Sequence, residues 1–239
     1  TTLHDLWHEI MEERHDADLT VYRRLEAMLG FDPDECPAEL YHKFANLIPR
    51  AGAAAITELA PVCASADPGA TLERVMAFAD TEGLEGQVDL ALPPGDSTAA
   101  IPALAWQKGK AFARRAREAA GLHGVAVADK LLCELVNLPL EQALNTKDTP
   151  MPRSPLSLAI RHGDARQLKF LLRKRNKPGR RFELARLLGD ALMADSSDRW
   201  LPATDVKTAR QKMQRAFAIE FLCPLERLTE FLGDDFSND

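Results

Sequence analysis

Apolar residues recur at spacings of three and four along most of this 239-residue chain, and this period constrains the fold more than any other feature. It opens with Leu3, Leu6, Trp7 and Ile10, followed by Val21, Tyr22, Leu25 and Leu29. Such spacing is typical of amphipathic helices, each of which must bury one face. The same pattern predicts further helices over residues 38–48, 52–63, 71–80, 101–120, 127–138, 180–193, 203–221 and 225–232.

One short segment has a different period. Leu168, Phe170 and Leu172 alternate with the basic residues Lys169 and Arg173, which predicts a β-strand within residues 166–175. A turn at residues 176–179 then leads into the next helix. We therefore expect an α+β fold that is predominantly helical and contains a small β-sheet.

A change in composition divides the chain. Residues 82–102 hold three glycines and three prolines and show no apolar period, as is typical of a linker. The sequence predicts a helical N-terminal region over residues 1–82, a linker over 83–100 and a second domain over 101–239.

Several classes of protein are excluded. No apolar run reaches the roughly 18 to 20 residues that a membrane crossing requires, and the acidic start does not resemble a signal peptide. The cysteines at 36, 63, 133 and 223 are too far apart for a local zinc knuckle or redox pair. We expect a cytoplasmic protein with reduced, buried thiols and no contact with membranes.

Charge is distributed unevenly along the chain. Residues 1–60 contain twelve acidic and five basic residues, whereas residues 153–186 contain eleven basic and two acidic ones. A basic face of this density predicts contact with nucleic acid, with an acidic partner or with the protein's own acidic N-terminal region. The candidate contacts are Lys169, Arg173, Lys174, Arg175, Lys177, Arg180 and Arg181.

Two segments carry a resemblance to a known family. Residues 181–192 read R-F-E-L-A-R-L-L-G-D-A-L, and residues 215–224 read R-A-F-A-I-E-F-L-C-P. With the strand before them, they resemble the active-site region of the ImmA/IrrE zinc metallopeptidases, whose intact helix reads R-F-x-L-A-H-E-L-G-H-x-L. The resemblance covers roughly residues 100–235 and implies a zincin-like C-terminal domain.

The residues that perform the family's chemistry are absent. Arg186 stands at the first zinc-binding histidine, Leu187 at the general-base glutamate and Asp190 at the second histidine. The third ligand of the family is a glutamate on the next helix, but residues 206–219 contain no Asp, Glu or His. A guanidinium does not bind a metal and leucine does not transfer a proton. We therefore expect no catalytic residue, no metal and no cofactor, and we expect Arg186 to pair with Asp190 across one helical turn.

The leading interpretation is a catalytically inactive, ImmA/IrrE-like regulatory or binding protein. Because intact members cut helix-turn-helix repressors in stress responses, phage induction and mobile-element control, the resemblance implies a helix-turn-helix regulator as partner. The first alternative is a nucleic-acid-binding protein that uses the basic segment at residues 169–186. An active metalloprotease with unusual ligands is the third interpretation.

Overall fold

The computed structural model describes residues 17–90, 104–145, 154–163 and 166–224, together with the single positions 92 and 229. Four helices come first, namely α2 (Ala17–Leu29), α3 (Ala38–Ala51), α4 (Ala53–Cys63) and α5 (Pro68–Asp80). Strand β1 (Leu84–Gln87) follows, and then α6 (Ala105–Ala119), α7 (Asp129–Glu134) and α8 (Leu140–Leu144). The last elements are β2 (Ser157–Arg161), β3 (Gln167–Leu171), α9 (Lys177–Met193), β4 (Trp200–Ala203) and α10 (Ala209–Leu222).

The four strands form one antiparallel sheet in the order β1-β3-β2-β4. Leu84 lies opposite Phe170, Leu158 opposite Leu171, and Ala159 opposite Leu201. The expected α+β class, mainly helical with a small sheet, is confirmed.

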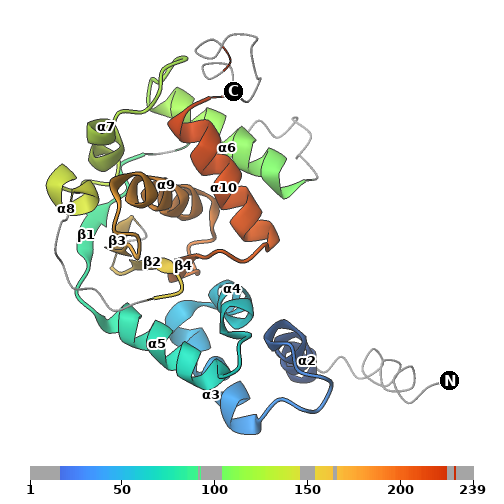
Figure 1. The fold of residues 1–239 in the computed structure, drawn as a ribbon. Coiled ribbons are helices and arrows are strands. Elements are labelled where there is room, and N and C mark those ends of the chain that lie inside the picture. The colour runs from blue at the N-terminus through green and yellow to red at the C-terminus, as the bar shows by residue number, and fades with distance from the viewer. Residues whose placement is uncertain are drawn as a thin grey trace, which may run out of the picture.

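Both faces of this sheet are buried, because successive side chains of a strand point in opposite directions. Leu158, Leu171 and Trp200 pack into a core formed with helices α2 to α5, where Phe44 and Leu59 are fully buried. Ala159, Phe170 and Leu201 belong to a second core on the other face, which contains Leu184 and Phe217. The sheet therefore lies between the N-terminal helices and the group α6 to α10 (Figure 1).

Strand β1 corrects the expected linker over residues 83–100. Residues 84–87 pair with β3, and the Val88 amide adds a bond to the carbonyl of Arg166 at 2.9 Å. Gly86 permits the close approach of the chain after α7, since a Cβ there would lie 2.4 Å from the Val136 carbonyl oxygen. A linker therefore cannot begin at residue 83, and most of residues 91–103 lie outside the described part of the chain.

Other boundaries also differ from the sequence-based expectations. Helix α5 begins at Pro68 rather than at residue 71, because the Asp67 carboxylate caps it by accepting a bond from the Ala70 amide at 2.8 Å. The helix expected over 127–138 is confined to α7, and the one expected over 203–221 begins only at Ala209, after strand β4. Helix α6 begins at Ala105 rather than at residue 101, and its Trp106 is 45% exposed. The helices expected over residues 3–10 and 225–232 lie outside the described residues.

The structure bears on the expected reduced thiols and on the absence of a membrane crossing. All four cysteines are free, and Cys36, Cys63 and Cys133 are buried. Burial raises the pKa of the Cys63 thiol to about 12 and that of Cys133 to about 11, so both thiols stay protonated. None of the helices in the described segments combines the length and apolar character that a membrane crossing requires.

Gly109 allows the close packing of α6 on α10. A Cβ at this position would lie 2.2 Å from the carbonyl oxygen of Met213 and 3.0 Å from the amide nitrogen of Phe217. Both are backbone atoms of α10, so a side chain can be accommodated only if the helices move apart. We expect Gly109→Ala to lower the free energy of unfolding by about 1–3 kcal/mol in urea denaturation.

Gly69 is the matched control for this substitution. It also lies in a helix, but a Cβ there would have its nearest contact at 3.6 Å, with the Asp67 carboxylate. Gly69→Ala is therefore expected to leave stability unchanged or to raise it by up to about 1 kcal/mol. An equal effect of the two alanines would contradict the close packing assigned to Gly109.

Candidate functional site

Helix α9 carries Arg186, Leu187 and Asp190, the three residues whose spacing resembles a zinc-binding motif. The helix begins at Lys177 because the Asn176 side chain accepts a bond from the Gly179 amide at 2.7 Å, and a proline occupies its first turn. Leu187 is fully buried in the core that α9 shares with the sheet. Arg186 and Asp190 are also buried, but in two different polar clusters.

The Arg186 guanidinium lies between β4 and α10. Its Nη2 donates to the Thr204 carbonyl at 2.7 Å, to Oε1 of Gln211, and to Oε1 of Gln214 at 3.3 Å. Burial, together with the nearby charge of Arg215, lowers the pKa of this guanidinium to about 10. The Nε of Arg186 is buried without a hydrogen-bond partner. Arg186 is therefore a buried cation held by neutral acceptors.

A carboxylate from the N-terminal helices completes this network. Glu58 of α4, only 5% exposed, accepts bonds from Oγ1 of Thr208 at 2.6 Å and from Nε2 of Gln211 at 2.9 Å. Since the amide oxygen of Gln211 accepts from Arg186, this one side chain bridges an anion and a cation. The polar network formed by Glu58, Gln211, Gln214, Thr204 and Arg186 is called the Arg186 network below.

Sequence reasoning missed the part played by Glu58. The sequence did hold a signal, because Glu58 is the one charged residue in the mostly apolar helix A-A-A-I-T-E-L-A-P-V-C. A carboxylate in such a helix is buried only when it has a partner.

Asp190 does not pair with Arg186, which corrects the expectation of a salt bridge across one turn. Its carboxylate instead pairs with Arg210 of α10. The Nε of Arg210 lies 2.9 and 3.1 Å from the two carboxylate oxygens, and Nη2 lies 2.9 Å from Oδ2. Nη1 of Arg210 lies 3.1 Å from Oδ2 of Asp198. Each α9 side chain thus finds a partner on α10, because those partners are held on a packed helix facing it.

In this second cluster, the opposite charges stabilise each other's ionised form. Complete burial raises the pKa of the Asp190 carboxyl, and the charge and hydrogen bonds of Arg210 oppose that rise. Burial also disfavours the Arg210 cation, but the two aspartates outweigh it and raise the Arg210 pKa. Asp190, Arg210 and Asp198 therefore form a buried ion-pair triad, called the Asp190 triad below.

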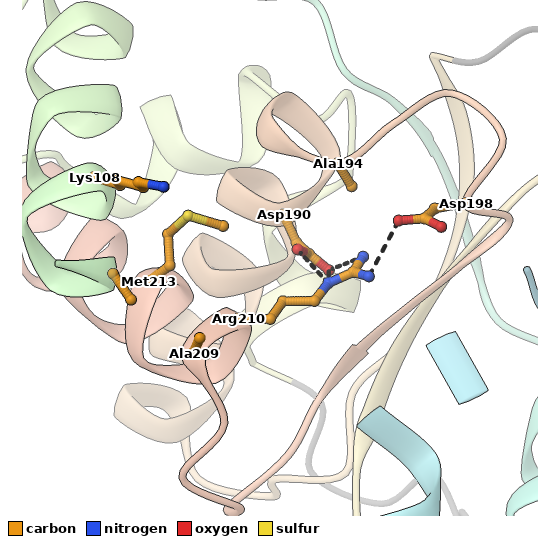
Figure 2. A pocket seen from close by; sticks show the side chains of 8 residues that line it. Lys108, Asp190, Ala194, Asp198, Ala209, Arg210 and Met213 are labelled. Atoms are coloured by element: carbon orange, nitrogen blue, oxygen red, sulfur yellow. Dashed lines mark hydrogen bonds and ion pairs between the residues drawn. The ribbon is translucent and has the colours of Figure 1, made fainter. Parts of the chain in front are cut away.

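A pocket of about 420 Å³ opens beside the Asp190 triad (Figure 2). It lies between the start of α6, the end of α9 and the start of α10. The pocket is lined by Ala105, Lys108, Asp190, Ala194, Asp198, Ala209, Arg210 and Met213.

The basic candidates of residues 169–186 are used mainly inside the molecule. The Lys169 ammonium donates to the carbonyls of Ala79 and Thr81 at 2.8 and 3.1 Å. Arg173 lies 2.9 Å from a carboxylate oxygen of Glu183 and 2.7 Å from one of Asp205. Both carbonyls lie at the end of α5, outside the acidic residues 1–60, so this contact does not test the predicted pairing of the acidic and basic regions.

The remaining candidates divide into two groups. Arg180 is buried and donates to the Ala143 carbonyl at 2.6 Å, while Lys177 and Arg181 both pair with Asp129. Lys174 is half-buried and Arg175 is exposed, and neither pairs with an acidic side chain among the described residues. Five of the seven candidates therefore hold the fold together.

The side chains of Arg186, Leu187 and Asp190 do not suit a zinc ion. Zinc is bound by imidazole, thiolate or carboxylate groups, usually four of them including water. Arg186 is a cation, Leu187 has no donor atom, and both carboxylate oxygens of Asp190 already accept bonds from Arg210. No set of three or more His, Cys, Asp or Glu side chains in the described residues is grouped to hold a metal.

Comparison with known proteins found no family model, no curated protein and no solved structure that matches this chain.

Proposed function

We propose that this chain is a catalytically inactive, ImmA/IrrE-like regulatory protein that binds a helix-turn-helix regulator. The observation that carries the proposal is the Arg186 network, in which a guanidinium occupies the position of a zinc-binding histidine. The cation is supplied by the protein itself and is held by the backbone carbonyl of Thr204 and by two glutamine side chains of α10.

The chemistry of the site supports the loss of catalysis. Peptide hydrolysis by a zinc enzyme needs an open metal position and a carboxylate base next to it. Leu187 stands in the place of that base and lies fully buried in the apolar core. Leucine cannot exchange a proton, which supports a binding role rather than zinc-dependent hydrolysis.

The surface near the site supports a protein partner. Leu104 and Trp106 at the start of α6 are 52% and 45% exposed, and Ile219 of α10 is 57% exposed. Exposed aromatic and aliphatic side chains of this size are typical of protein–protein interfaces, where tryptophan often contributes strongly to affinity. The identity of the partner class rests on the resemblance of residues 181–192 and 215–224.

Binding is tested by capturing regulators with the full chain from its host and then measuring each one as a purified protein. We expect a captured helix-turn-helix regulator to bind and to stay uncleaved. Trp106→Ala should weaken this binding by about tenfold or more. Lys130→Ala is the control, since Lys130 is 82% exposed on α7 and should leave binding unchanged.

Two outcomes would contradict this proposal. One is a purified protein that holds about one transition metal per chain and cleaves the captured regulator. The other is captured material in which no regulator of this class binds after purification.

Nucleic-acid binding through residues 169–186 is less well supported. Specific and nonspecific binding to nucleic acid depends on cations that are free to meet phosphates. Only Lys174 and Arg175 of the seven candidates lack an internal partner among the described residues, so the segment would neutralise about two phosphates.

A further inference from the structure

The pocket beside the Asp190 triad has no role in the proposed function. We propose that it is a binding site for aliphatic carboxylates, with Lys108 pairing with the carboxylate group and the apolar wall holding its alkyl chain. The proposal does not depend on the regulator, because it concerns a small acid and can be tested without any protein partner.

The charges around the pocket favour an anion. Asp190 and Asp198 are both paired with Arg210 at distances of 2.9 to 3.1 Å. Lys108 comes from α6, on the other side, and its amino group points into the pocket (Figure 2). No carboxylate of the described residues pairs with Lys108, so its charge is left for a ligand.

The nearby end of α9 does not cancel this preference. The last carbonyls of a helix carry a partial negative charge that would repel an anion. Here Arg161 donates to the carbonyls of Ala191 and Ala194 at 2.8 and 3.4 Å, and to the Asp198 carbonyl at 3.0 Å. The guanidinium therefore satisfies the end of α9 and adds a second positive charge to the aspartate side of the pocket.

The remaining wall favours an alkyl chain. It consists of Ala105, Ala194, Ala209 and the flexible side chain of Met213. A volume of about 420 Å³ lies within the range of roughly 300–1,000 Å³ typical of small-molecule sites. A short chain on these side chains leaves its carboxylate within reach of Lys108. An apolar wall and an ammonium group that has no carboxylate partner among the described residues together define the ligand class.

The test uses the full chain and isothermal titration calorimetry with acetate, butyrate and hexanoate. We expect each added methylene to tighten binding about fourfold until the pocket is filled. Hexanamide, which has the same chain without the charge, should bind at least tenfold more weakly than hexanoate. A blocked tripeptide with a central glutamate tests whether a peptide side chain can supply the carboxylate instead of a free acid.

Two variants test whether hexanoate binds at Lys108. Lys108→Met keeps the length of the side chain and should lower hexanoate affinity at least tenfold while leaving hexanamide unchanged. Lys110→Met is the control, because Lys110 lies over the Trp106 ring and is not among the lining residues. Binding of either hexanoate or the glutamate peptide that depends on Lys108 supports the proposal. It is overturned if neither probe binds, if hexylamine binds as well as hexanoate, or if the two variants lose equal affinity.

Discussion

Replacing Arg186 by alanine is expected to lower the free energy of unfolding by about 3–5 kcal/mol. The side chain is 2% exposed and is among the largest fully buried ones. Its loss leaves a cavity and removes the donor to Oε1 of Gln214, while the Thr204 carbonyl keeps a bond from Arg215 and Oε1 of Gln211 keeps one from the Thr204 amide. It also leaves Glu58 as a buried carboxylate whose bridging partner Gln211 no longer faces a cation. The measurement is urea denaturation followed by circular dichroism.

Arg175→Ala is the control for Arg186→Ala. Arg175 is exposed, so the variant should stay within about 0.5 kcal/mol of the parent. Arg186→Met separates charge from volume, because it fills most of the space and removes the donors. If the hydrogen bonds matter as argued, methionine should recover only part of the loss. A methionine variant as stable as the parent would show that the Arg186 network contributes packing alone.

The helices were predictable because their apolar period is local. Helices α3, α4 and α9 follow from residues three and four apart, and the turn at Asn176 follows from its side chain and Pro178. Most of the sheet was not predictable in this way. The four residues of β4 are all buried, so they show no alternation, and a short run such as W-L-P-A does not distinguish strand from helix.

The candidate site was likewise predictable only where its residues lie close together in the sequence. Arg186, Leu187 and Asp190 could be located from sequence because they lie within one helical turn and match a spaced pattern. Their partners could not, since Gln211 is 25 residues from Arg186 and Arg210 is 20 residues from Asp190. The pairing expected between Arg186 and Asp190 used only neighbours along the helix. The packed α10 offers each of them a partner with better geometry, and tertiary contacts decide the outcome.

Asp190→Ala is the second substitution with a large expected effect, again about 3–5 kcal/mol. The carboxylate is fully buried and accepts three bonds from a guanidinium that is itself mostly buried. Removing it leaves Arg210 with Asp198 alone in a region of low dielectric constant. Asp80→Ala breaks the exposed ion pair with Arg50 and should cost no more than about 1 kcal/mol, so it is the matched control.

A double-mutant cycle with Arg210→Ala measures the pair directly. When both partners are absent, neither leaves the other as an unpaired buried charge, so the double variant should lose less stability than the two single losses added together. The difference should be about 0.5–3 kcal/mol, as is usual for residues in direct contact. Simple additivity, or a loss for Asp190→Ala no larger than that for Asp80→Ala, would mean that Asp190 and Arg210 are not coupled in the folded protein. The Asp190 triad would then be a poor candidate for the charged wall of a ligand pocket, because that wall must keep its charges paired when the pocket is empty.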